Sequence, residues 1–145
     1  MRNDNSIYWK NKQENAGKAV KHTKIMKELH GEEIEKCIAG SQIYSEAVNL
    51  AFPENGNIPR VIMAKVDTVS AILRYTDDKT AVLNFASYKN PGGMFLQGSK
   101  AQEECLCHES FLYNVLNAFN DTYYSWNKKN LNKALYLNRA IYSPD

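Results

Sequence analysis

The sequence predicts a single α/β domain, and three observations support this class. The chain has 145 residues, of which 43% are apolar, and this is enough to build one core. Two apolar runs, at 61–66 and 80–85, have the length of buried strands, and a short helical pattern separates them. A strand, a helix and a strand in that order are typical of a parallel crossover. We therefore expect an α/β sheet.

Two helices are expected before the sheet, at 10–30 and 32–39. In the first, apolar positions recur every three or four residues, which is the period of a helix that buries one stripe. Gly31 separates the helices and Gly40 follows the second. We expect an N-terminal helical extension over residues 10–40, with its lysines in solvent. The apolar positions of the first helix are Ala16, Ala19, Val20, Thr23, Met26 and Leu29.

The crossover is predicted from three successive segments. Residues 61–66 (VIMAKV) form a near-continuous apolar run, followed by Asp67 or Thr68 as the N-cap of a short helix. A turn is expected at 77–79. Residues 80–85 (TAVLNF) form the second run of the same buried type.

Short strands are also expected on either side of this crossover. Residues 41–45 (SQIYS) have the pattern of a strand, whereas 51–60 contain two prolines, a glycine and two asparagines and are expected to be a loop. Residues 134–143 end in a strand-like run. A strand at 139–143 would expose an edge, and unprotected edges pair with other chains. The sequence therefore predicts a homodimer through this edge.

A longer helix is expected at 102–119, where apolar residues recur with helical spacing. Residues 120–133 then interleave aromatic side chains with lysines. This pattern can bind single-stranded nucleic acid by stacking, but aromatics where helices meet are more often packing anchors, and no nucleic-acid motif accompanies them. We expect packing and no direct nucleic-acid binding. The residues concerned are Tyr123, Tyr124, Trp126, Lys128, Lys129 and Lys133.

Composition excludes several classes of protein. The net charge of +2 is too close to neutral to predict a nucleic-acid or membrane partner. Cys37, Cys105 and Cys107 match neither a zinc ligand set nor a disulfide framework, so reduced thiols and no bound metal are expected. No apolar run is long enough to cross a bilayer, and residues 1–10 lack the apolar region of a signal peptide. These features predict a cytoplasmic protein.

The candidate functional stretch directly follows the second apolar run. Ligands bind at the carboxyl ends of parallel strands, so this is where a ligand site is expected. The stretch contains Asn90, Pro91, Gly92 and Gly93 in succession. Proline fixes φ, and the two glycines can adopt positive φ and lack side chains, so backbone N–H groups can approach a ligand such as a diphosphate. A plain tight turn is the alternative interpretation.

Two adjacent carboxylates, Glu103 and Glu104, stand at the start of the helix predicted at 102–119. Acidic residues at a helix N-terminus usually complement the helix dipole and keep depressed pKa values. A catalytic acid needs the opposite, a desolvated pocket that raises its pKa. Adjacent helical residues project about 100° apart, so one glutamate can face such a pocket while the other binds a second group.

The stretch VLNFASYKNPGGMFLQGSKAQEECLCHESFLY resembles the signature of the bacterial-type poly(ADP-ribose) glycohydrolases, a family with a macrodomain fold. The family pattern is a triple glycine, a short spacer and then Gln-Glu-Glu. Gly92-Gly93-Met94 stands at the glycines, and Gln102-Glu103-Glu104 at the acidic motif. The similarity extends from the N-terminal helices to LYLNRAIYSPD at the end, and so covers nearly the whole chain.

The resemblance implies a macrodomain-like fold, with a mixed sheet flanked by helices. It implies cleavage of O-glycosidic ribose bonds in ADP-ribose, in an ADP-ribosylated protein or in the polymer, without cofactor or metal. Glu104 would be the acid that protonates the departing ribose oxygen, and Glu103 would bind ribose or leaving-group hydroxyls. The other implied ligand-binding residues are Asn84, Ser87 and Asn90 at the distal ribose, the backbone of Gly92, Gly93, Met94 and Phe95 at the diphosphate, and Gln102.

The chain also departs from the family pattern. Met94 replaces the third glycine, and its side chain would restrict the approach of the loop to a ligand or exclude a positive φ. Ser87 stands where many relatives have asparagine. Relatives continue beyond the equivalent of Asp145, so residues 41–145 are expected to form a partial core without the family's C-terminal half. A non-catalytic ADP-ribose-binding module and an inactive fragment therefore stay open as alternatives.

Three further residues near the motif receive structural assignments. Cys105 is expected to be a small buried side chain rather than a nucleophile. His108 follows Glu104 by four positions and is expected at the surface. Tyr113 is expected to pack in or near the core.

Overall fold

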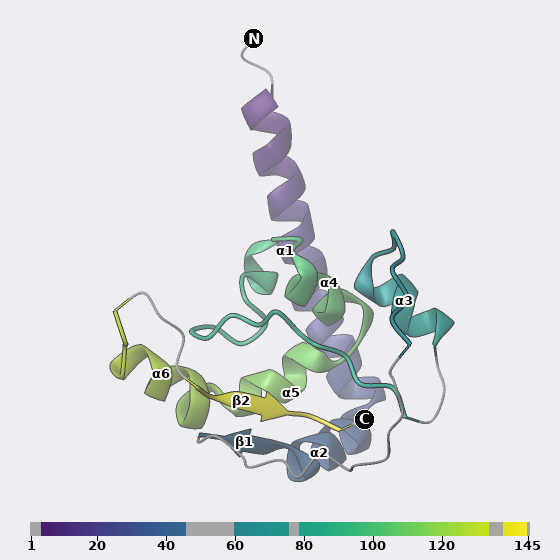
Figure 1. The fold of residues 1–145 in the computed structure, drawn as a ribbon. Helices are drawn as coiled ribbons and strands as arrows, with labels where there is room; N and C mark the ends of the chain where they lie inside the picture. The colour runs from purple at the N-terminus through teal and green to yellow at the C-terminus, as the bar shows by residue number, and fades with distance from the viewer. Residues whose placement is uncertain (1–3, 46–59, 76–78, 134–137, 145) are drawn as a thin grey trace.

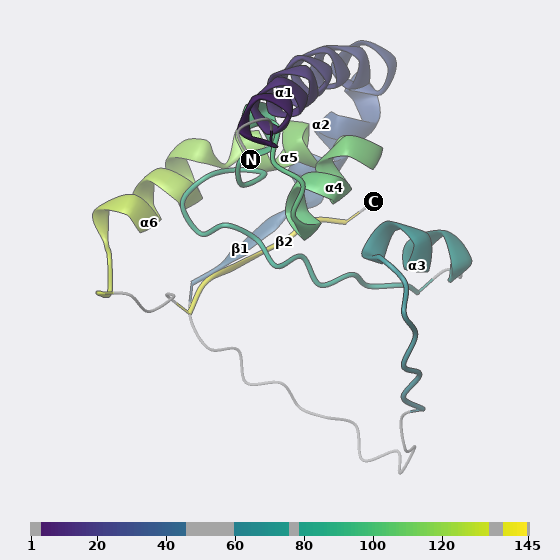
Figure 2. The ribbon, with the colours of Figure 1, turned by 90° about the horizontal axis from the view of Figure 1, so that it is seen from above.

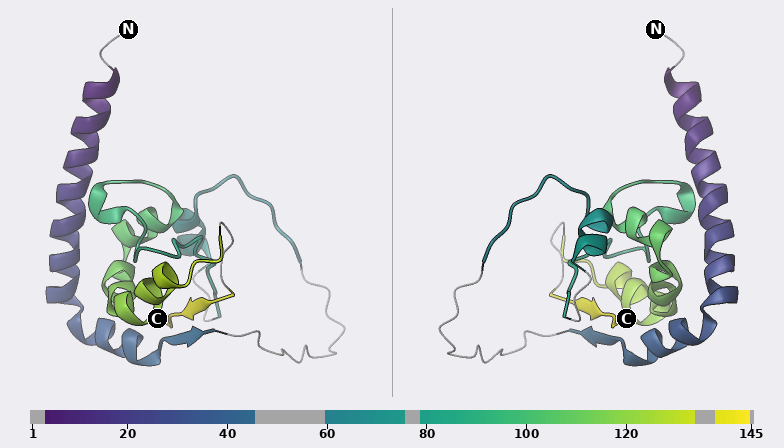
Figure 3. Two further views of the ribbon diagram at one scale, coloured as in Figure 1. Left: turned by 90° about the vertical axis from the view of Figure 1, so that its left-hand side faces the viewer. Right: turned by 90° about the vertical axis from the view of Figure 1, so that its right-hand side faces the viewer.

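The longest element of this computed structural model, which describes residues 4–45, 60–75, 79–133 and 138–144, is the helix α1 (Asp4–Leu29). It stands along one side of the other helices, and its N-terminal end extends beyond them (Figure 1). His30 separates α1 from α2 (Gly31–Gly40), which runs at an angle to α1 from its C-terminal end, so the two helices form an L (Figure 3). The two N-terminal helices predicted from the apolar pattern are confirmed, although α1 begins earlier than expected.

The sheet is small and joins segments from the two ends of the chain. Strand β1 (Gln42–Tyr44) pairs antiparallel with β2 (Ala140–Tyr142), with Ile43 opposite Ile141. The short strands expected at 41–45 and near the end of the chain are thus confirmed. In the described part of the chain this antiparallel pair is the whole sheet, so the fold is mixed and helix-rich, and the parallel sheet expected from the crossover is not formed there. The homodimer through 139–143 stays a prediction that sedimentation at micromolar concentration tests.

The two buried strands predicted for the crossover are wrong. Residues 61–66 and 80–85 are extended but belong to no strand, and Met63 is 94% and Leu83 73% exposed. Figure 2 shows the segment before α3 leading away from the helices. The physical reason is that no neighbouring strand pairs with either run in the described structure, and an apolar run alone does not specify the partner that would bury it.

The short helix between these segments is present as expected. It is α3 (Thr68–Arg74), and Asp67 is its N-cap, with the carboxylate accepting hydrogen bonds from the Ser70 N–H at 2.9 Å and the Ser70 hydroxyl at 2.7 Å. The parts of the predictions that fall on 51–59, 77–78 and 134–137 lie outside the described residues.

The single helix predicted at 102–119 is divided in two. Helix α4 (Gln102–Glu109) ends at Ser110, whose backbone is extended at φ −152°, and α5 (Leu112–Ala118) follows. The Ser110 hydroxyl explains the break, because it donates to the Leu106 carbonyl at 2.8 Å and accepts from the Leu112 N–H at 3.2 Å. A serine side chain that bonds the local backbone in this way competes with helix continuation.

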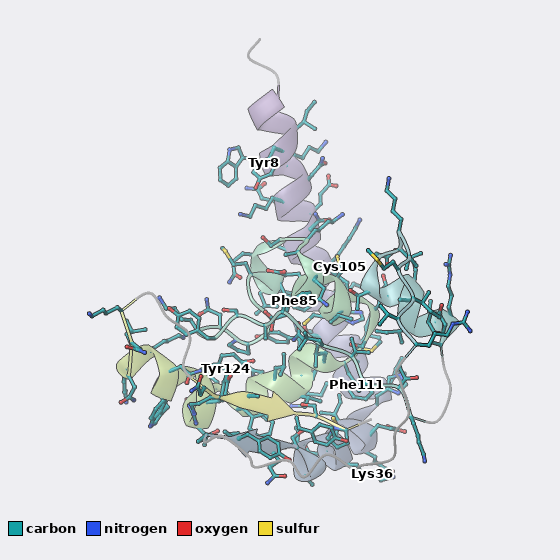
Figure 4. All side chains as sticks on the ribbon, viewed as in Figure 1. Tyr8, Lys36, Phe85, Cys105, Phe111 and Tyr124 are labelled. Carbon is teal, nitrogen blue, oxygen red and sulfur yellow. The ribbon has the colours of Figure 1, made fainter. Side chains whose placement is uncertain are left out.

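Beyond α5 the chain forms the π-helical turn η2 (Asn120–Ser125) and the short α6 (Trp126–Lys129). Tyr123 and Tyr124 are buried there against Leu116, and Tyr124 lies between the helices and β2 (Figure 4), so the expectation of packing is confirmed for these two tyrosines. None of the helices in the described ranges is long and apolar enough to span a membrane.

The loop between the second extended segment and α4 is fixed against α1. It contains the short 3-10 helix η1 (Phe95–Gln97), whose Phe95 side chain is fully buried against Ala19 of α1 and Cys107 of α4. Gly98 ends η1 at φ 79° and lies directly on the α1 backbone at Lys12 and Ala16, where a Cβ atom has no room. This anchoring determines the position of the glycine turn that precedes η1.

Candidate functional site

The glycine turn at residues 90–95 folds back on itself through its own backbone. The Gly93 N–H donates to the Asn90 carbonyl at 3.0 Å, and the Phe95 N–H donates to the Gly92 carbonyl at 3.1 Å. Gly92 and Gly93 have φ values of 66° and 62°, in the left-handed region where glycine is favoured. Met94 follows at φ −111°, which any residue can adopt, so the methionine at the third glycine position strains no backbone dihedral.

Close packing explains both glycines independently of φ. A Cβ atom on Gly93 would lie 2.6 Å from Glu104 Oε1 and 3.1 Å from Glu103 Oε2. A Cβ atom on Gly92 would lie 2.8 Å from the Tyr113 ring. The turn is therefore held between the two carboxylates on one side and Tyr113 on the other, and the absence of side chains is what lets the carboxylates come so close.

Glu103 and Glu104 both lie buried at the start of α4, with exposed fractions of 3% and 6%. Glu104 Oε1 accepts a hydrogen bond from the Met94 N–H at 2.9 Å, and Glu103 Oε2 accepts one from the Ser87 N–H at 2.8 Å. Each carboxylate thus holds a different part of the loop, although both approach Gly93. Glu103 Oε1 is buried and makes no hydrogen bond to the described residues.

The electrostatics of Glu103 are those of a desolvated carboxylate. Burial raises the pKa of Glu103 above its ordinary value, against the opposing hydrogen bond from Ser87, and the negative charge of Glu104 adds to the increase. Acidic residues at a helix N-terminus were expected to have depressed pKa values, and this expectation is wrong for Glu103. The glutamate with the raised pKa is thus Glu103, for which the resemblance implies hydroxyl binding, and not Glu104, for which it implies the role of the acid.

An open hollow of about 400 Å³ lies beside the two carboxylates. The chain from 85 to 90 forms one wall, and the glycine turn with the start of α4 forms the other. We refer to it as the acidic hollow. Its lining residues include Ser87, Tyr88, Lys89, Asn90, Gly93, Met94, Glu103 and Glu104.

Most of the site residues predicted from the sequence are brought together here. Ser87 contributes its N–H to Glu103, while its hydroxyl accepts from the Lys89 and Asn90 N–H groups at 3.3 and 3.2 Å and so shapes the loop. Asn90 is exposed on the rim. Met94 lines the hollow with 47% of its surface exposed.

Three predicted ligand-binding residues have other contacts. The Gln102 amide accepts from the Phe85 N–H at 2.7 Å and donates to the Leu83 carbonyl at 2.8 Å, so it holds the extended segment against α4. The Phe95 side chain lies in the core. Asn84 reaches Glu103, because a hydrogen bond from its side chain opposes the rise of the Glu103 pKa, and it also lines a separate hollow beside Tyr123 and Asn127, where its Oδ1 atom is buried without a hydrogen-bond partner among the described residues.

The predictions for the neighbouring residues of α4 and α5 hold in part. Cys107 rather than Cys105 is the fully buried thiol, and burial raises its pKa, which excludes a reactive thiolate. His108 is half-buried, with its ring 4.7 Å edge-on from Phe95, so the expected surface position is wrong. Tyr113 packs against Phe95 at 5.3 Å, as expected.

Asn127 is a site-supporting residue that the sequence did not reveal. It is 1% exposed, and its amide donates to the Tyr88 carbonyl of the loop at 2.9 Å. Its Oδ1 accepts from Arg139 at 2.7 Å, and the Arg139 guanidinium lies 4.1 Å from the Trp126 ring centroid. Asn127 lies in a polar stretch of the sequence, and its partner Tyr88 is 39 residues away, so no local pattern indicates this contact.

A glycine turn against two buried adjacent glutamates, one with a raised pKa, is an arrangement suited to acid–base chemistry. The chain belongs to the family described as microbial-type PARG, catalytic domain, where PARG is poly(ADP-ribose) glycohydrolase, because the model of that family matches residues 10–145. The resemblance seen in the glycine and Gln-Glu-Glu motifs is thereby confirmed. Neither a curated protein nor a solved structure matches the chain.

Proposed function

We propose that the acidic hollow binds an ADP-ribose unit of poly(ADP-ribose) or of an ADP-ribosylated protein and hydrolyses the O-glycosidic ribose bond. Membership of the microbial PARG family supports a glycohydrolase at the level of the family. The observation that carries the proposal for this chain is the pair of buried carboxylates held against Gly93, where only a residue without a Cβ atom fits. The proposed domain is macrodomain-like.

Glu104 is proposed as the general acid and base. In the first step its carboxyl group donates a proton to the departing ribose oxygen as the anomeric C–O bond breaks, and its carboxylate then takes a proton from the water whose oxygen attacks the anomeric carbon. The net reaction consumes one water and returns Glu104 to its protonated form. The Met94 N–H, 2.9 Å from Glu104 Oε1, fixes the side chain that performs these transfers.

Glu103 is proposed to bind a ribose hydroxyl through Oε1, the buried oxygen that has no partner in the described structure. A hydroxyl donor placed there would offset the cost of that unpaired acceptor. The ligand diphosphate is proposed to bind the backbone of the glycine turn. Ser87 and Asn90, on the loop opposite, are proposed to contact the distal ribose.

The test is release of ADP-ribose from the polymer by the full chain and by Glu104→Gln. We expect a loss of about 10²–10⁴-fold, the usual contribution of a positioned general acid. Glu35→Gln, on the exposed face of α2, is the matched control and should keep full activity. Equal rates for the wild-type chain and Glu104→Gln would reject the mechanism.

The same preparations separate the two alternatives. Calorimetric binding of ADP-ribose without turnover would identify a binding module, an outcome to which the Met94 side chain in the hollow points. A melting temperature unchanged by ADP-ribose would identify an inactive fragment that folds but does not bind ADP-ribose.

A further inference from the structure

A second hollow, of about 770 Å³, lies between α1, the start of α3 and α4. It is built from different side chains than the acidic hollow, since α4 contributes Glu103 and Glu104 to one and Cys105, His108 and Glu109 to the other. Figure 4 shows Cys105 on the side of α4 that faces α3. We call this cavity the basic hollow and define it by Lys18, Lys21, His22, Lys100 and His108.

Cations reach the basic hollow from two separate elements. Lys18 and Lys21 lie three positions apart on α1 and therefore share a face of that helix, and Lys100 comes from the loop before α4. Two carboxylates, Asp67 and Glu109, also line it. The Asp67 carboxylate accepts hydrogen bonds from the Ser70 N–H and hydroxyl at the start of α3 and keeps its charge, so three lysines face two carboxylates around the hollow.

Two histidines, His22 and His108, lie beside these lysines. His22 Nε2 lies 2.9 Å from the Ser110 carbonyl, which makes that nitrogen the donor and leaves the opposite edge of the ring for other contacts. Burial lowers the pKa of His108, and the nearby charges of His22, Lys100 and Lys18 lower it further, while Glu109 opposes them. Clustered cations that disfavour another positive charge favour an anion in the same space.

One side chain that lines the basic hollow, His108, also contacts the glycine turn of the proposed active site. The His108 ring contacts Phe95 edge-on at 4.7 Å, and Phe95 directly follows Met94, whose N–H holds Glu104. A polymer of ADP-ribose carries one diphosphate per unit, so a chain with one unit in the acidic hollow presents further diphosphates to neighbouring surfaces. A second cationic site on the same molecule then raises the effective concentration of the polymer at the first.

We propose that the basic hollow binds a diphosphate group, and that in the polymer this is the diphosphate of a unit other than the one being cleaved. The second half of the proposal rests on the proposed function, and the first half does not. Lys18 and Lys21 of α1 and Lys100 before α4 hold the anion, and His22 lies beside them.

Inorganic pyrophosphate is the direct probe, titrated into the full chain by calorimetry with the histidine ring signals followed by NMR. We expect the His22 and His108 signals to shift, and the affinity to fall about tenfold or more in Lys18→Glu/Lys21→Glu. Lys24→Glu/Lys27→Glu is the matched control, because these lysines are exposed on the same helix, do not line the hollow and change the net charge equally. Lys100→Glu reaches the hollow from another element and should weaken binding in the same direction.

Equal weakening by both double variants would show general charge attraction and overturn the proposal, as would the absence of pyrophosphate binding. A polymer arm tests the source of the diphosphate. Lys18→Glu/Lys21→Glu should weaken binding of a polymer of several units and leave binding of single ADP-ribose to the acidic hollow unchanged, so equal loss of both contradicts the second half. Failure of the proposed function would appear as no hydrolysis by any variant and would leave the pyrophosphate result intact.

Discussion

The glycine turn with α4 and the two extended apolar segments differ in how the chain holds them. The turn is fixed by side chains of both glutamates, by its own backbone hydrogen bonds and by the buried Phe95. The segments 61–66 and 80–85 have the more apolar sequences, yet Val61 is 82% and Leu83 73% exposed. Within the described structure, the Gln102 amide is what ties the second segment to α4.

The difference shows that apolar content alone does not bury a segment. The turn is held by the two glutamates that follow it in the sequence and also by the packing of Phe95 on Ala19 of α1. A strand needs a neighbour to pair with, and the extended segments have none among the described residues. Stability should therefore depend strongly on the helical core and the turn, and weakly on the extended segments.

The largest expected difference in unfolding free energy is between the leucine-to-alanine substitutions at a buried and at an exposed position. Leu116→Ala removes a side chain that is 5% exposed and packs with Tyr124, and should cost about 2–5 kcal/mol of unfolding free energy. Leu83→Ala, at a 73% exposed position, should change it by less than about 0.5 kcal/mol. Chemical denaturation of both variants gives the comparison, and a large loss at Leu83 would show that the segment is buried in solution.

The next largest difference in stability is expected between alanine substitutions at two glycines. Gly93→Ala places a Cβ atom 2.6 Å from Glu104 Oε1 at a φ of 62°, and should destabilise the chain by about 2 kcal/mol or more and abolish ADP-ribose binding. Gly17→Ala, in α1 with no atom within 4 Å of the added Cβ, should stabilise it by about 0.5–1 kcal/mol. Thermal unfolding distinguishes the opposite signs, and tolerance of Gly93→Ala would contradict the close carboxylates.

A smaller effect is expected at the asparagine that holds the loop. Asn127→Ala removes the donor to the Tyr88 carbonyl and the acceptor for Arg139, two partly buried hydrogen bonds, and should cost roughly 1–2 kcal/mol. Asn130→Ala removes an exposed hydrogen bond to the Trp126 carbonyl, and should be near neutral. Urea midpoints of the two variants test this, and equal effects would mean that the loop does not depend on Asn127.

The smallest effect is a pH dependence. Burial raises the pKa of Glu103, so its contribution to stability is fully present below its ordinary pKa of 4.5 and is lost as the pH rises through the folded value. The unfolding free energy of the wild-type chain should therefore fall relative to Glu103→Gln as the pH rises. Asp67, whose pKa is lowered by hydrogen bonds from Ser70, should show the opposite sign against Asp67→Asn. Parallel pH profiles for wild-type and Glu103→Gln would contradict the desolvated carboxylate.

The sequence predicted those parts of the fold that local signals encode. The N-terminal helices, the N-cap at Asp67 and the glycine turn follow from periodicity, capping and glycine chemistry, and the acidic pair follows from its motif. The break at Ser110 was missed because a serine in an apolar helical pattern gives no sign that its hydroxyl will bond Leu106 and Leu112.

Long-range contacts were beyond the sequence signals. Nothing local indicates that Gln102 pairs with Leu83 and Phe85, or that Asn127 reaches Tyr88. The burial of Glu103 also depends on such contacts, since the loop that covers it comes from Ser87 and the turn from Gly93. The motif therefore predicted that the glycine turn and the two glutamates lie together, but not which of the two glutamates is desolvated.

The most direct test of the central claim is a titration of the full chain with ADP-ribose, followed by backbone amide NMR. The claim predicts the largest shifts at Ser87, Gly93 and Met94, whose N–H groups lie at Glu103, in the turn and at Glu104. Shifts that leave these three amides unchanged, or no shift at millimolar ADP-ribose, would contradict an ADP-ribose site at the glycine turn and the glutamate pair.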